Sequence, residues 1–117
     1  MKLYAFDVDE TLTISGGPVH VVKLRALHNN GHVVGICGNF AVLTAKVPDW
    51  HRFISFIGQM EMSKPAFLTQ LKRHIPAEEY IMVGNIPGVS GSSADQPAAA
   101  EAGFRFISEA DFANGER

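Results

Sequence analysis

The sequence contains a single cysteine, Cys37, among its 117 residues. One cysteine excludes an intramolecular disulfide framework, on which many small extracellular domains depend. No apolar run approaches the roughly 20 residues of a membrane-spanning helix. The N-terminus enters the first predicted strand without the layout of a signal peptide. We therefore expect a cytoplasmic protein with no membrane partner.

The sequence also lacks an excess of charge of either sign, because its formal net charge is −2. A broad nucleic-acid surface needs a clear basic excess, so the charge does not indicate a nucleic-acid partner, although a local basic patch is compatible with it. Apolar residues, in contrast, make up 46% of the chain. That is enough to bury one core at this length, and we expect a single domain over residues 1–117.

Short apolar runs alternate with helical patterns along the chain. The apolar runs predict strands at residues 2–6, 32–37, 53–57, 80–83 and 104–107, and the patterns between them predict helices at 19–30, 40–47, 63–74 and 98–102. Apolar strands separated by helices favour a parallel sheet covered on both faces. The predicted fold class is therefore a three-layer α/β sandwich with a central parallel sheet, followed by a short C-terminal tail.

Several polar residues are placed to begin the predicted helices. Asn39 precedes the second helix, and Ser63 precedes the third, in which Pro65 suits the first turn. Asp95, followed by Gln-Pro, is a good N-cap for the fourth. The preceding Gly/Ser-rich stretch, residues 84–94, lacks the Gly-Lys-Ser/Thr ending of a nucleotide P-loop, and we expect a flexible connector there.

Two carboxylates, Asp7 and Asp9, follow the first predicted strand. Side chains alternate along a strand, so both are expected on one face, at the carboxyl end where open α/β sheets place their sites. Carboxylates this close repel each other, and a divalent cation bound by oxygens would relieve the repulsion. One carboxylate can then act as nucleophile and the other as acid/base. The alternative is a polar loop after a strand, where Asp and Thr are common.

Right-handed crossovers bring the loops that follow parallel strands to one edge of the sheet. Besides the two carboxylates and Thr11, these loops carry Cys37, Gly38, Asn39, Lys64, Asn85 and Asp95. Carboxylates, a lysine and backbone amides suit a phosphoryl group with a magnesium ion, since cation and lysine neutralise oxygens while an oxygen nucleophile attacks phosphorus. A cysteine hydrolase fits less well, because Cys37 has no evident histidine and acid partner in the sequence.

These motifs resemble those of the haloacid dehalogenase superfamily of aspartate-dependent phosphohydrolases and phosphotransferases. The resemblance extends from Leu3 to about Ile107 and rests on four motifs in the family's order. They are the apolar strand with Asp7-Val8-Asp9-Glu10-Thr11, the segment Val33 to Asn39, the pair Lys64-Pro65, and Tyr80 to Asn85 together with Asp95-Gln96-Pro97-Ala98-Ala99-Ala100-Glu101-Ala102-Gly103.

The resemblance implies a magnesium-dependent phosphatase that acts through an aspartyl-phosphate. Asp7 would be the nucleophile. Asp9 would protonate the leaving group and then activate water, and its backbone carbonyl would bind the metal. Thr11 would fix the loop, and Lys64 would offset the charge of nucleophile and phosphate. The implied sets are catalytic Asp7, Asp9, Thr11 and Lys64; phosphate-binding Cys37, Gly38, Asn39 and Lys64; and, for Mg²⁺, Asp7, Asp9, Asn85 and Asp95.

Cys37 departs from the family's pattern, which usually has Thr or Ser there. A thiol is a weak hydrogen-bond donor, so the amides of Gly38 and Asn39, or the Asn39 side chain, would take over part of the phosphate contact. The alternative is that Cys37 is simply a small buried strand residue.

Asn85 is the second departure, since the family usually has Asp at this position. Its amide oxygen can bind magnesium but brings no charge, so metal affinity should fall. Asp95 has two compatible interpretations, metal contact and helix capping. Lys64 has a simpler alternative as an exposed lysine at the start of a helix.

The intervals in which this family inserts a substrate-selecting cap are short here, which implies a capless enzyme. An open site suits a large phosphorylated substrate, such as a nucleic-acid end or a phosphoprotein. It also suits a small one if neighbouring subunits of a homo-oligomer supply the lid. The alternative function is a binding or assembly module whose chemistry is weakened or lost. Asn85 and Cys37 motivate that alternative, whereas Asp7, Asp9, Thr11 and Lys64 argue against it.

Overall fold

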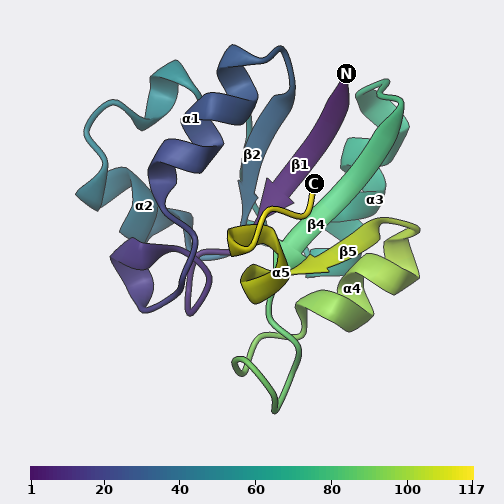
Figure 1. The fold of residues 1–117 in the computed structure, drawn as a ribbon. Coiled ribbons are helices and arrows are strands. Elements are labelled where there is room, and N and C mark those ends of the chain that lie inside the picture. The colour runs from purple at the N-terminus through teal and green to yellow at the C-terminus, as the bar shows by residue number, and fades with distance from the viewer.

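The computed structural model describes residues 1–117 and contains one five-stranded parallel sheet in the order β3-β2-β1-β4-β5 (Figure 1). The strands are β1 (Lys2–Phe6), β2 (Val33–Cys37), β3 (Ile57–Gly58), β4 (Glu79–Gly84) and β5 (Arg105–Ser108). The helices are α1 (Val21–Asn29), α2 (Phe40–Lys46), α3 (Lys64–His74), α4 (Asp95–Ala102) and α5 (Glu109–Ala113), with short 3-10 helices η1 (Thr13–Ser15) and η2 (Trp50–Arg52). The predicted three-layer α/β fold class is confirmed.

The two faces of the sheet are covered by different helices (Figure 1). Tyr4 and Phe6 of β1 pack in the core beneath α1, α2 and α5, whereas Leu3 and Ala5 pack in the core beneath α3 and α4. This separation follows from the alternation of side chains along a strand. Asp7, the next odd-numbered residue, therefore belongs to the face covered by α3 and α4.

The central position of β1 decides where its carboxyl end lies. On one side β1 pairs with β2, in a register that runs from Leu3 opposite Val33 to Phe6 opposite Ile36. On its other side it pairs with β4. The chain runs outward from β1 to β2 and β3, and then crosses to β4 and β5. The end of β1 is thus at the point where the strand order reverses, which is where open parallel sheets place ligand sites.

The third strand differs from its prediction. Residues 53–56 were expected in it, but the strand covers only Ile57–Gly58. Phe53 and Ile54 are buried at the end of the η2 turn, where the Ile54 N–H donates to Trp50 O at 3.0 Å. Their apolar character reflects burial of a turn against the core, so the β-rich composition indicated the wrong element.

The C-terminal tail was also predicted wrongly, because residues 109–113 form α5. The Ser108 hydroxyl accepts from the Asp111 N–H at 3.2 Å and caps this helix. Phe112 is fully buried and meets Phe6 edge to face, with ring centroids 5.2 Å apart. The tail therefore completes one face of the sheet.

The intervals that were expected to lack a cap contain little structure. Between β1 and α1 lies only η1, and between β2 and β3 lie only α2 and η2. The molecule measures 32 × 30 × 29 Å along its principal axes. None of its helices combines the length and apolar character needed to span a membrane.

Candidate functional site

Asp7 lies directly after the central strand. Its N–H donates to Val83 O at 2.9 Å, which continues the pairing of β1 with β4 by one residue. Its side chain turns toward α3 and α4 and is only 3% exposed. The backbone thus fixes a buried carboxylate at the middle of the sheet's carboxyl edge.

Loops from three strands meet around this carboxylate, as the sequence predicts. Lys64, the first residue of α3, places Nζ 3.0 Å from Asp7 Oδ1 and also contacts Asp95 Oδ1. Asn85, directly after β4, places Nδ2 3.3 Å from Asp7 Oδ2. Ser63 holds the start of α3, because its hydroxyl accepts from the Ala66 N–H, which confirms the predicted cap.

Burial and charge shift the pKa values of this cluster. Burial, reinforced by the charge of Asp95, raises the pKa of Asp7 to about 6, although Lys64 opposes the shift. Burial by itself would lower the pKa of Lys64, but the charges of Asp7 and Asp95 together outweigh it and leave that pKa above its ordinary value. Lys64 is therefore a firm cation, and Asp7 is an acid that ionises with difficulty.

The side chain of Asn85, which follows β4, connects this part of the chain to the loop after β1. Nδ2 donates to the Asp9 carbonyl at 2.9 Å as well as to Asp7, and Oδ1 accepts from the Thr11 hydroxyl at 3.3 Å. Asn85 and Thr11 are both fully buried. Through this hydrogen bond, Thr11 ties the loop after β1 to Asn85, the residue that follows β4.

Asp95 does not cap α4, so that prediction is wrong. Ala94 is the N-cap residue, and Asp95 lies inside the helix, which begins three residues before the predicted start at Ala98. Its fully buried carboxylate accepts from the Asn85 N–H at 2.7 Å and from Lys64. The side chain therefore points into the site, where it binds the backbone of the loop after β4 at Asn85.

Asp9 does not share the orientation of Asp7, contrary to the expectation from strand alternation. The strand ends at Phe6, and the N–H groups of Thr11 and Leu12 fold back to Val8 O in a turn. The Asp9 carboxylate accepts from Ser15 Oγ at 2.8 Å and from Asn39 Nδ2 at 3.3 Å. It is half-buried, and thus more accessible than Asp7.

Three of the predicted phosphate-binding residues, Cys37, Gly38 and Asn39, lie at the end of β2 and directly after it, and their surroundings differ. Cys37 is fully buried in the core beneath α3 and α4, and burial raises the pKa of its thiol to about 12. The Gly38 N–H is used in the sheet, where it donates to Gly58 O at 2.8 Å. Asn39 occupies the N-cap position of α2, but its side chain donates to Asp9 instead of capping.

Three backbone N–H groups beside Asp7 are left without an acceptor in the protein. They belong to Val8, Asp9 and Asn39. N–H groups without an acceptor in the protein can bind the oxygens of an anion. Of the amides predicted to contact phosphate, Asn39 thus retains a free N–H and Gly38 does not.

Two glycines allow the polar side chains to lie where they do. A Cβ at Gly38 would lie 2.2 Å from Asp7 Oδ1, and one at Gly91 would lie 2.7 Å from Asn85 Nδ2. Neither the packing of Gly91 against Asn85 nor the contact of Ser15 with Asp9 is predicted by the sequence. Gly91 lies in the Gly/Ser-rich stretch, so composition alone gave no reason to single it out.

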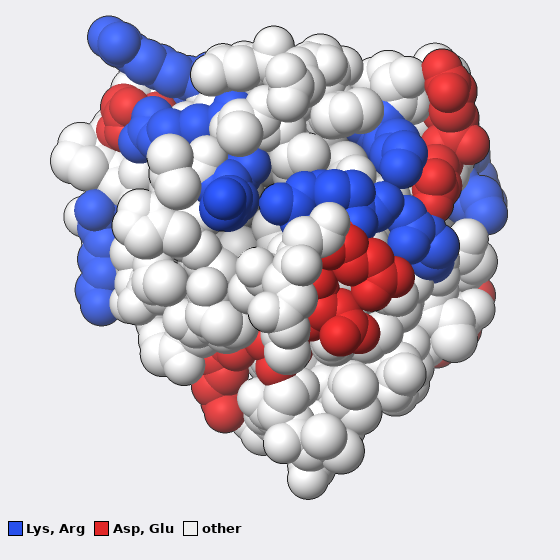
Figure 2. All heavy atoms as spheres, viewed as in Figure 1, with Lys and Arg blue, Asp and Glu red and all other residues white.

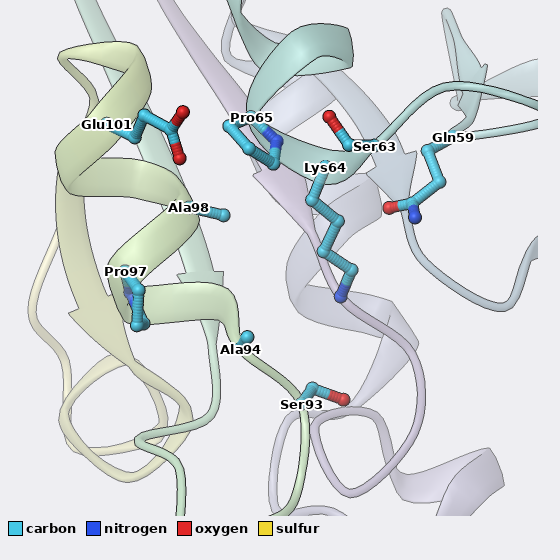
Figure 3. Close-up of a pocket in the computed structure, with 9 residues that line it drawn as sticks. All are labelled: Gln59, Ser63, Lys64, Pro65, Ser93, Ala94, Pro97, Ala98 and Glu101. Atoms are coloured by element: carbon cyan, nitrogen blue, oxygen red, sulfur yellow. The ribbon is translucent and has the colours of Figure 1, made fainter.

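A hollow of about 420 Å³ adjoins the cluster. It opens between the N-terminal ends of α3 and α4, and the Lys64 side chain extends into it (Figure 3). Gln59 Oε1 is buried there without a hydrogen-bond partner. The lining residues are Gln59, Ser63, Lys64, Pro65, Ser93, Ala94, Pro97, Ala98 and Glu101.

The donor set does not fit the predicted magnesium ion in this arrangement. Asn85 presents Nδ2, a hydrogen-bond donor, to Asp7 and Asp9, whereas magnesium requires oxygen ligands. Both carboxylate oxygens of Asp95 already accept hydrogen bonds, and the Asp9 carboxylate faces Ser15. No group of three or more acidic, histidine or cysteine side chains is arranged to hold a metal ion. Magnesium binding stays a prediction from the sequence.

The fold and site together define a class of protein. It is a three-layer α/β protein with a buried carboxylate, lysine and amide cluster at the carboxyl edge of its sheet. Comparison with protein-family models, with curated proteins and with solved structures finds no match. The resemblance to the haloacid dehalogenase superfamily therefore rests on the four sequence motifs.

Proposed function

We propose that the protein is a phosphatase of haloacid dehalogenase type, which hydrolyses phosphate monoesters through an aspartyl-phosphate at Asp7. One observation carries the proposal: the Asp7 carboxylate is 3% exposed and is held between Lys64 Nζ at 3.0 Å and Asn85 Nδ2 at 3.3 Å. An ordinary structural role does not require a carboxylate with a raised pKa at the strand-order reversal. The motifs supply the remaining support.

In the first step, an Asp7 oxygen attacks phosphorus while the bond from phosphorus to the leaving oxygen breaks. Asp9, as the general acid, gives a proton to the leaving oxygen. Lys64 and the free N–H groups of Val8, Asp9 and Asn39 stabilise the phosphoryl oxygens, which carry the developing charge. The products are an alcohol and a phosphorylated Asp7.

In the second step, water attacks the phosphorus of the aspartyl-phosphate. Asp9, now a carboxylate, takes a proton from this water, and the bond between phosphorus and the Asp7 oxygen breaks. Inorganic phosphate leaves, and both carboxyl groups return to their starting states. The half-buried position of Asp9, beside Ser15 and Asn39, suits a group that exchanges protons with solvent.

The hollow beside Lys64 offers room for the organic part of a substrate (Figure 3). Most of the surface that lines the hollow is apolar, with Gln59, Ser63, Ser93 and Glu101 as its polar side chains, which favours a largely apolar organic part that carries a few hydrogen-bonding groups. Lysine and arginine side chains lie beside acidic ones on the face in Figure 2. Elsewhere in the protein too, basic side chains are paired with acidic ones, as Arg105 is with Glu79. That mixture does not favour a nucleic-acid substrate.

A trapping experiment tests the proposal. The protein is mixed with an aryl phosphate, with and without magnesium chloride, and treated with borohydride, which reduces an acyl phosphate to an alcohol. Mass spectrometry should find homoserine at position 7 in the wild type, and Asp7→Asn should lose hydrolysis by at least a hundredfold. Asp111→Asn, an exposed change of the same kind on α5, should retain both. Hydrolysis that persists in Asp7→Asn would refute the proposal.

A binding module without turnover is the second candidate. It is favoured by the near-complete burial of Asp7, because a nucleophile must contact phosphorus directly. In that case the wild type would bind inorganic phosphate, and Lys64→Met would weaken this binding, yet no trapped homoserine would form. Calorimetric titration with phosphate, alongside the trapping experiment, separates the two candidates.

A further inference from the structure

We propose that the side-chain amide of Asn85 takes the place of a divalent cation, so that this site is assembled without metal. The inference concerns the same site as the proposed function. It rests on the proposed function only in treating the cluster as a phosphatase active site. The hydrogen bonds of Asn85 do not depend on whether the protein is a phosphatase. It assigns Asn85 a positioning role toward Asp7 and the Asp9 backbone.

The amide nitrogen lies between two oxygens that the sequence resemblance assigns to magnesium. Nδ2 of Asn85 is 2.9 Å from the Asp9 carbonyl oxygen and 3.3 Å from Asp7 Oδ2. Its two protons can serve one oxygen each. A magnesium ion would need both oxygens at about 2.0–2.1 Å, in the space that these protons fill. The amide and the ion are therefore alternatives for the same oxygens.

The orientation of the amide is set by the oxygens that it faces. The Asp9 carbonyl can only accept a hydrogen bond, so Nδ2 is directed to it and to Asp7, while the Thr11 hydroxyl, which can donate or accept, donates to Oδ1 at 3.3 Å. If the amide turned over, Oδ1 would face the Asp9 carbonyl, and two acceptors would repel each other unless a cation lay between them. Gly91 packs directly on the amide, since a Cβ there would lie 2.7 Å from Nδ2.

The rest of the cluster is also satisfied without an ion. Asp95 uses one oxygen for the Asn85 N–H and the other for Lys64, so it would have to break a contact to bind a cation. The buried side-chain atoms that lack a hydrogen-bond partner, Gln59 Oε1 and Glu109 Oε2, lie outside this cluster. A buried polar network in which each member has a partner is the stable kind.

Magnesium binding to four variants tests the inference without relying on turnover. Thermal unfolding is measured in EDTA and in excess magnesium chloride for the wild type, Asn85→Asp, Asn85→Ala and Asn30→Asp. The last adds the same charge at an exposed helix end. Calorimetric titration of the wild type with magnesium gives a second reading that needs no variant.

We expect magnesium to leave the midpoint of the wild type and of Asn30→Asp unchanged and to produce no binding heat at the wild-type site. Asn85→Asp should unfold at a lower temperature than the wild type in EDTA, because it adds a third carboxylate beside Asp7 and Asp95. Magnesium should raise its midpoint by on the order of 5–10 °C. An Asn85→Asp chain that folds only with magnesium gives the same answer.

Two results would overturn the inference. One is magnesium binding by the wild type that Asn85→Ala abolishes, because the amide would then have turned its oxygen to the ion. The other is an Asn85→Asp protein that matches the wild type in EDTA and ignores magnesium. Failure of the phosphatase proposal can be distinguished from failure of this inference. The first appears as an absence of hydrolysis and of trapped homoserine, whereas the second is measured by the unfolding midpoints, which do not depend on activity.

Discussion

The ammonium group of Lys64 lies 3.0 Å from Oδ1 of Asp7, although the two residues are 57 positions apart in the chain. The sheet topology brings them together, because Asp7 ends the central strand and Lys64 begins the helix that follows the edge strand. Their side chains are 15% and 3% exposed, respectively. The contact is thus largely removed from water, where a charge without its partner is costly.

Lys64→Met should destabilise the protein strongly. The change leaves Asp7 and Asp95 buried beside each other without a cation, and removal of one partner of a buried pair costs about 3–5 kcal/mol. Urea unfolding at pH 7 measures the loss. Lys72→Met, on the same helix, removes an exposed lysine that donates to Gly103 O and should cost about 0.5 kcal/mol. Equal losses in the two variants would show that the Lys64 contacts contribute no more than a surface contact.

Asp7→Asn should stabilise the protein at neutral pH. The pKa of Asp7 is raised from 3.8 to about 6 by burial and by Asp95, with Lys64 opposing. Between these values the folded state holds a proton that the unfolded state has released, so stability falls as pH rises through this window. The variant should exceed the wild type by on the order of 2–3 kcal/mol above pH 6, and the difference should vanish toward pH 4.

The difference between the two unfolding free energies at each pH isolates Asp7 together with the charged groups that it interacts with, Asp95 and Lys64, because groups elsewhere titrate alike in both proteins. Asp95, Lys64 and Asn85 are the side chains that contact Asp7 or shift its pKa. A difference that is constant between pH 4 and pH 7 would show that Asp7 does not titrate in this range.

Gly38→Ala should displace the Asp7 carboxylate. The added Cβ would lie 2.2 Å from Asp7 Oδ1, so the side chain or the loop has to move. Overpacking of this kind costs about 1–3 kcal/mol. If Asp7 is the nucleophile, phosphatase activity should fall by at least a hundredfold. Gly88→Ala is the control: its Cβ would meet nothing within 4 Å, and although the φ of 75° there costs an alanine about 1 kcal/mol of backbone strain, it should keep full activity. Wild-type activity in Gly38→Ala would contradict the geometry.

Much of the fold could be predicted because the controlling signals are local. The apolar run at residues 2–6 and the Ser63 cap before α3 appear where expected, since each depends on burial or on a nearby backbone group. The two failures arose where long-range packing decided the structure. Phe53 is buried as part of a turn and not of a strand. Phe112 is buried against Phe6, which holds the C-terminal residues on the sheet.

The candidate site was predictable as a set of residues but not as a set of contacts. Topology alone brings Asp7, Lys64, Asn85 and Asp95 to one edge. The direction of the Asp95 carboxylate was not predictable, because it depends on the Asn85 N–H, which only the folded loop presents. Likewise, Asp9 does not point in the same direction as Asp7, because β1 ends at Phe6 and the backbone then turns. The alternation of side chains along an ideal strand does not extend into such a turn.

Cys37 should resist thiol reagents while the protein is folded. Its side chain is fully buried, and burial raises the pKa of its thiol to about 12, so the reactive thiolate is on the order of 10⁻⁴ of the population at pH 8. We expect an aromatic disulfide reagent to react at least a hundredfold faster in urea than with the folded protein, and the folded rate to rise with pH. A folded thiol that reacts as fast as the unfolded one would place the sulfur at the surface of the site. That result would favour the predicted phosphate contact of Cys37 over its role as a buried strand residue.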